Sequence, residues 1–189
     1  MPLNVTLEIS DRELEHFRSV LAGARERTAG KTPHEVAVAA RSTVDKLHAG
    51  TPSPFVATRL NKVHALIDML EDPEWRLPEP ERRRVLDGLA YVAEAHDMVP
   101  DDVPVLGLVD DAIMLELVLD ELQHELDGYR DFHEFRQHEL ARPGASAHSA
   151  ASREDWLDSK RRALHDRIRD RRQRELEQRG GDFPLITHF

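Results

Sequence analysis

The sequence contains no cysteine and few aromatic residues. Only 5% of its 189 residues are Phe, Trp or Tyr. The missing cysteine excludes disulfide bonds, thiolate zinc sites, iron–sulfur clusters and a cysteine nucleophile. The scarcity of aromatic side chains argues against the base-stacking surfaces that bind single-stranded nucleic acid, and the net charge of -10 argues against general nucleic-acid binding. We therefore do not expect a nucleic-acid partner.

A secretion signal and long apolar segments are also missing. The chain begins Met-Pro-Leu-Asn, without a basic region followed by an apolar stretch. The longest charge-free run near the middle, residues 103–109, is far shorter than the ~20 apolar residues that cross a bilayer. We expect a soluble, cytoplasmic protein that is not an integral membrane protein.

Apolar residues recur at spacings of three and four along most of the chain, which predicts an all-α protein. We expect a domain of five helices over residues 10–142, whose long fifth helix covers residues 111–140. Alternating apolar and polar residues at the N-terminus predict an extended arm over residues 1–9. Small residues predict a linker over residues 143–152. An Arg-rich helical extension and tail follow in residues 153–189.

The starts of the predicted helices carry specific local signals. Ser10 and Glu13 fit a capping box, in which the first side chain accepts a hydrogen bond from the third backbone N–H of the helix and the carboxylate reaches back. Thr32 and Glu35 repeat this pattern. Ser152 is predicted to cap the helix of the extension.

A segment rich in Pro and Asp separates the fourth and fifth predicted helices. The pattern is formed by Tyr91, Asp97, Pro100, Asp101, Pro104, Gly107, Asp110 and Asp111. This spacing resembles the signature of the YkvA-like family of bacterial helical proteins, a domain of unknown function. The resemblance covers about residues 86–126 and implies a helix–loop–helix unit without an assigned reaction. Tyr91, Pro100, Pro104 and Gly107 would then be structural residues of the motif.

The same region has an unusual charge distribution. Residues 85–129 contain twelve carboxylates and no Lys or Arg, although 26 basic residues in 189 would place about six in such a stretch. One interpretation is structural: Asp110 and Asp111 cap the start of a helix, where negative charge is favourable. The other carboxylates of the long helix are then expected on its outer face, namely Asp120, Glu121, Glu125 and Asp127.

The alternative interpretation is a metal site. Asp97 follows the C-terminus of a predicted helix, where the helix dipole disfavours a carboxylate. If the flanking helices are antiparallel, Asp97 and Asp101 would lie near Asp110 and Asp111. Four converging carboxylates need a neutralising group, and a divalent cation such as Mg²⁺, Mn²⁺ or Ca²⁺ would suit.

The C-terminal extension has the opposite charge balance, with eight arginines and four carboxylates in residues 161–179. Its candidate interaction residues are Arg161, Arg162, Arg169 and Arg172. The segment would dock on the acidic domain of the same or a neighbouring chain, contact nucleic acid or an anionic membrane, or form a solvated helix.

These features favour a non-enzymatic adaptor or regulatory interaction module that binds a protein partner or self-associates. The alternative is a divalent-metal-binding protein or a metal-dependent hydrolase, with the Asp cluster as ligands and His96 as a base. No cofactor other than such a cation is indicated.

Overall fold

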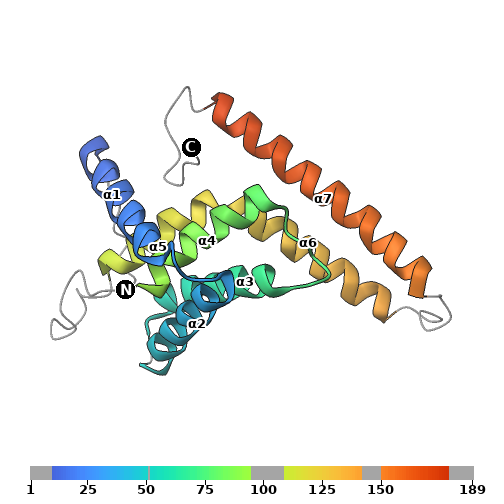
Figure 1. The fold of residues 1–189 in the computed structure, drawn as a ribbon, viewed down its shortest axis with the longest axis horizontal. Helices are drawn as coiled ribbons and strands as arrows, with labels where there is room; N and C mark the ends of the chain where they lie inside the picture. Colours follow the sequence, from blue (N-terminus) through green and yellow to red (C-terminus); the bar gives the residue numbers. More distant parts are fainter. Residues whose placement is uncertain (1–9, 51, 95–108, 142–149, 179–189) are drawn as a thin grey trace, which may run out of the picture.

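The computed structural model describes residues 10–50, 52–94, 109–141 and 150–178 (Figure 1). All regular secondary structure in these ranges is α-helical, which confirms the predicted all-α class for this part of the chain. The helices are α1 (Asp11–Thr28), α2 (Pro33–Ala49), α3 (Pro54–Glu71), α4 (Glu79–Ala93), α5 (Val109–Glu121), α6 (Gln123–Leu140) and α7 (Ala150–Gln178). The described part therefore holds seven helices, more than predicted.

Both predicted capping boxes are present. The backbone N–H of Ser10 donates to the Glu13 carboxylate over 2.7 Å, and the N–H of Glu13 donates to the Ser10 hydroxyl over 3.4 Å. The corresponding distances for Thr32 and Glu35 are 2.6 and 3.2 Å. Local chemistry thus fixes the starts of α1 and α2, because each box satisfies amides that the helix itself leaves unpaired.

The single long helix predicted over residues 111–140 is wrong. The structure has α5 and α6 instead, with Leu122 between them at φ −105° and ψ 12°. On α4, Arg84 donates a 2.8 Å hydrogen bond to the backbone carbonyl of Glu121, the last residue of α5. A side chain that binds a helix carbonyl is a known cause of a bend. The break therefore depends on a contact between helices that periodicity cannot reveal.

The helix of the C-terminal extension begins earlier than predicted. α7 starts at Ala150, so Ser152 is the third residue of the helix and not the residue that precedes it. With 29 residues α7 is the longest helix of the described part. The predicted arm over residues 1–9 and the first part of the predicted linker, residues 143–149, lie outside the described residues.

The helices pack around one core. α2 contacts α3 and α4, α1 contacts α4, and α3 contacts α5 and α6. α6 and α7 form an antiparallel pair, with α7 on the side of α6 away from α2 and α3 (Figure 1). None of the described helices has both the length and the hydropathy needed to cross a membrane.

The turn between α3 and α4 joins the core to α6 and α7. Its Trp75 side chain is fully buried. The centre of this indole ring lies 5.1 Å from that of Phe132 and 5.8 Å from that of Tyr129, both on α6. On α7, the His165 ring is 4.2 Å away. The turn therefore sets where both C-terminal helices can pack.

Candidate functional site

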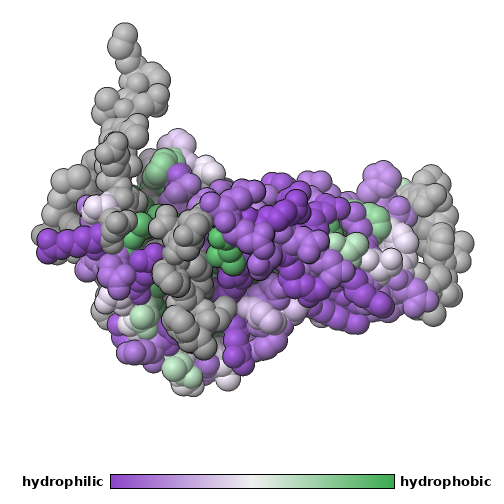
Figure 2. Space-filling model, turned by 90° about the horizontal axis from the view of Figure 1, so that it is seen from above, coloured by the Kyte–Doolittle hydropathy of each residue, from purple (hydrophilic) through white to green (hydrophobic). Residues whose placement is uncertain are grey.

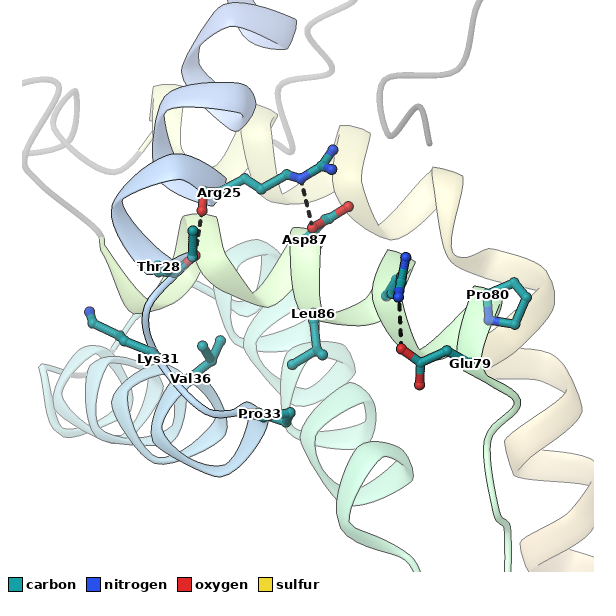
Figure 3. A pocket seen from close by; sticks show the side chains of 11 residues that line it. Arg25, Thr28, Lys31, Pro33, Val36, Glu79, Pro80, Leu86 and Asp87 are labelled. Carbon is teal, nitrogen blue, oxygen red and sulfur yellow. Dashed lines mark hydrogen bonds and ion pairs between the residues drawn. The ribbon is translucent and has the colours of Figure 1, made fainter. Parts of the chain in front are cut away.

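A groove of about 620 Å³ lies between the end of α1, the start of α2 and the first half of α4 (Figure 3). Pro33 and Val36 of α2 and Leu86 of α4 form its apolar part. Local interactions determine where two of the helices that border the groove begin or end. The Thr32 capping box fixes the start of α2, and the Thr28 hydroxyl donates to the carbonyl of Ala24 over 3.0 Å at the end of α1.

Charges of both signs border this apolar part. The Arg25 guanidinium lies 3.5 Å from the Asp87 carboxylate, and Arg83 lies 3.0 Å from Glu79. Burial raises the pKa of Asp87, and the nearby Arg25 and Arg83 oppose that rise. Lys31 is a third cation of the lining. Its ammonium group pairs with a carboxylate outside the groove, on Glu94.

An apolar patch with a mixed-charge border can hold a polypeptide segment, because protein-binding surfaces combine an apolar centre with a polar rim. The groove differs from a metal centre: within the described residues, no three His, Asp or Glu side chains are placed to hold one ion. Sequence patterns did not reveal this groove, since its lining comes from three helices and contains no motif. Its local signals were limited to the Thr32 capping box and to Pro33 and Pro80 near the starts of α2 and α4.

The counter-charges of the acidic stretch come from outside it. Cations on α1, α3, the α1–α2 turn and the residues that directly flank the stretch pair with its carboxylates. The pairs are Arg25–Asp87, Arg27–Glu94, Lys31–Glu94, Arg59–Glu116, Arg84–Glu125 and Arg130–Asp127. Arg130–Asp127 lies within α6, and the other five pairs join parts of the described chain that belong to different helices or to the α1–α2 turn.

The predicted outer-face position of Glu125 is wrong. Its side chain is 1% exposed and pairs with Arg84, whose side chain is 2% exposed. Glu121 is 10% exposed and lies 4.0 Å from the same guanidinium. Burial lowers the pKa of Arg84, while the carboxylates of Glu125 and Glu121 oppose that change. Asp120, in contrast, is exposed as predicted.

The four candidate arginines of α7 occupy three different environments. Arg161 is buried, where it pairs with Asp158 and donates a 2.7 Å hydrogen bond to the Glu74 carbonyl. Arg172 is half-buried, and both burial and the charge of Arg84 lower its pKa. Arg162 and Arg169 are exposed. Figure 2 shows that the outward surface of α7 is largely hydrophilic.

The motif residues of the Pro- and Asp-rich segment are described only at its two ends. Tyr91 is buried in α4, and its role in the motif stays a prediction. Asp110 and Asp111 lie in the first turn of α5, and nothing further is described of their side chains. Five more predicted residues lie outside the described part: Asp97, Pro100, Asp101, Pro104 and Gly107.

The divalent-metal site of the Asp cluster stays a prediction with a direct test. If it exists, Mg²⁺, Mn²⁺ or Ca²⁺ at about 100 times its Kd should add about 2.7 kcal/mol of stability, which raises Tm by about 5–10 °C. Asp97→Ala should abolish the shift in differential scanning fluorimetry. Asp102→Ala, outside the predicted set, should keep it. An unchanged Tm of the unaltered chain with all three ions at millimolar concentration would exclude this site.

Comparison with protein-family models, with curated proteins and with solved structures found no match. The YkvA-like resemblance therefore stays a prediction, and function is argued from the geometry of the chain itself.

Proposed function

We propose that this protein is a non-enzymatic interaction module that binds a segment of a protein partner in the groove between α1, α2 and α4. The groove itself carries this proposal. Its volume of about 620 Å³ falls within the range of about 300–1,000 Å³ that is typical of ligand-binding clefts. In its apolar part, Val36 belongs to the buried core and Leu86 packs against that core.

The charges of the lining indicate the chemistry of the segment. The lining holds three cations, Arg25, Lys31 and Arg83, and two carboxylates, Glu79 and Asp87. Among the lining residues cations exceed carboxylates by one, which favours an acidic partner, because complementary charge speeds association and selects the partner. The carboxylates of such a partner would compete with Asp87 for Arg25 and with Glu94 for Lys31. We propose a segment in which apolar side chains contact the groove and acidic residues lie towards Arg25 and Lys31.

A random peptide library displayed on phage and selected on the full chain tests this proposal. Selection should enrich peptides that combine acidic and apolar residues. The double variant Arg25→Gln/Lys31→Gln should then weaken binding of an enriched synthetic peptide about tenfold, since a partly exposed charge pair contributes up to about 1 kcal/mol. Fluorescence anisotropy of the labelled peptide measures the change in Kd.

The matched control removes two cations from another groove of similar size, about 510 Å³, between α3 and α6. Lys62→Gln/Arg130→Gln alters the net charge by the same amount but lies in this second groove. It should change Kd less than twofold. Equal weakening by the two double variants would refute a specific role for the groove between α1, α2 and α4, as would enrichment of basic peptides.

A further inference from the structure

The apolar face that α7 turns towards α6 is short, and ion pairs such as Arg167–Asp131 and His124–Glu175 also join the two helices. Leu157, Leu164 and Ile168 are almost fully buried. At Gly128 of α6 the two helices approach closely, because a Cβ atom built there would lie 2.5 Å from Cδ1 of Ile168. The interface is thus closely packed, yet it offers few apolar side chains along a helix of 29 residues.

A buried histidine lies in the middle of this face. The His165 side chain is 6% exposed. Its Nε2 lies 3.2 Å from the carbonyl oxygen of Trp75, and its ring centre lies 4.2 Å from that of the indole, with the two planes tilted by 41°. Since a carbonyl only accepts hydrogen bonds, Nε2 carries the proton and Nδ1 is the unprotonated nitrogen of the neutral ring. Nδ1 is buried, with no hydrogen-bond partner among the described residues.

Protonation would therefore give Nδ1 a hydrogen that has no acceptor among the described residues, and it would place a positive charge in a buried site. On α7, the positive charges of Arg161 and Arg169 act against a protonated His165, and on α4 the Glu81 carboxylate favours it. The residue of the α3–α4 turn that contacts the His165 ring is Trp75. On α6, Phe132 lies beside the Trp75 indole. Burial is the largest influence, and the pKa of His165 is lowered.

We propose that His165 makes the docking of α7 sensitive to pH: α7 is held most firmly at neutral pH and is released more often in mild acid, which transiently uncovers the surface around Trp75. The sign follows from linkage. A released His165 binds a proton near its ordinary pKa of about 6.5, whereas the docked one resists protonation. Docking is therefore at full strength above about pH 6.5 and weakens below it, by up to about tenfold at pH 5.5.

Hydrogen–deuterium exchange of the full chain tests this release. After correction for intrinsic exchange rates, amides of α7 should exchange up to about tenfold faster at pH 5.5 than at pH 7.5, while amides of α2 and α4 should not change. Equal corrected exchange rates of the α7 amides at the two pH values would overturn the proposal. A rise in all helices together would also overturn it, since that indicates global unfolding.

Two variants test whether His165 causes the pH dependence of α7 exchange. Gln at position 165 keeps a donor for the Trp75 carbonyl but does not titrate, so His165→Gln should remove the pH dependence of α7 exchange. His138→Gln, at an exposed position on α6, should retain it. The reverse pattern would refute the role of His165. If His165→Gln does not fold, the pKa of His165 measured by NMR in the unaltered chain decides: a value below 6.5 supports the proposal, and 6.5 or above overturns it.

Discussion

Replacing Arg84 with alanine should lower the free energy of unfolding by about 3–5 kcal/mol, because removal of one partner leaves the other as an uncompensated buried charge. Arg84 and its partner Glu125 are both buried. The same guanidinium binds the carbonyl of Glu121 at the break between α5 and α6. Arg84→Ala therefore strips a carboxylate and a backbone carbonyl of their donor at once. Urea denaturation followed by circular dichroism measures the loss.

The adjacent residue is the matched control. Arg83 lies on the same helix and also pairs with a carboxylate, Glu79, but both side chains are largely exposed. Exposed ion pairs contribute little, so Arg83→Ala should change stability by no more than about 0.5 kcal/mol. Similar losses in Arg84→Ala and Arg83→Ala would show that the buried pair does not anchor α4 to α6.

A double variant separates the buried charge from the lost packing. In Arg84→Met the Glu125 carboxylate stays buried without its partner. Adding Glu125→Met removes that charge, so the double variant should be more stable than Arg84→Met alone, by about 1–3 kcal/mol. A double variant less stable than Arg84→Met would mean that the remaining polar groups around Glu125, on Glu121 and Arg172, need its carboxylate.

Local parts of this fold were accessible from the sequence because local chemistry fixes them. Ser10 and Thr32 each have the acidic residue three positions later that completes a capping box. The apolar seam of the long predicted helix is also buried as expected, including Leu119 and Phe132. Both signals act over one or two helix turns, so no knowledge of the tertiary fold is required.

Contacts between residues far apart in the sequence could not be predicted from the sequence. Arg84 and Glu125 lie 41 positions apart, and each carries a charge that composition normally assigns to the surface. The deficit of cations over residues 85–129 did show that partners had to come from elsewhere. Periodicity cannot choose between the many arginines available. The same limit concealed the groove, whose lining unites residues of α1, α2 and α4.

Trp75 shows a further reason why part of the fold could not be predicted from the sequence. It lies in a turn, where hydrophobic periodicity does not apply, yet it is fully buried. Its burial depends on the chain reversal that Asp72 stabilises, through hydrogen bonds from the backbone N–H groups of Glu74 at 2.8 Å and Trp75 at 3.2 Å. Asp72 is followed by Pro73, a pattern that indicates only the end of a helix. The second role of Asp72, as a partner of α6, requires the tertiary structure.

Asp72→Ala should cost about 3 kcal/mol of unfolding free energy. One carboxylate oxygen accepts the two turn amides, and the other accepts the Tyr129 hydroxyl at 3.1 Å and the Arg136 guanidinium at 2.8 Å. Bonds of charged groups contribute about 1.5–3 kcal/mol, and capping bonds about 1. Asp72→Asn keeps an acceptor for the amides but loses the charge, so it should cost about 1–2 kcal/mol.

Asp68→Ala is the control for the same helix. Asp68 also pairs with an arginine, at 3.0 Å on Arg41, but its side chain is 56% exposed. Its loss should cost no more than about 0.5 kcal/mol. Equal costs for Asp72→Ala and Asp68→Ala would refute the anchoring role of the turn. If Asp72→Asn were as damaging as Asp72→Ala, charge pairing with Arg136 would outweigh the turn amides.

The pH dependence of stability gives an independent measure of the contact between Asp72 and the Tyr129 hydroxyl. Burial and the negative charge of Asp72 raise the pKa of Tyr129 to about 12. The unfolded chain loses this proton near pH 10. The stability that the neutral phenol contributes is therefore complete below about pH 10 and is lost as pH rises from there towards 12. Asp72→Asn removes the negative neighbour, so it should lower this pKa and make the alkaline loss smaller. Urea midpoints between pH 9 and 11 measure it, and an unchanged slope in Asp72→Asn would show that burial alone sets the pKa of Tyr129.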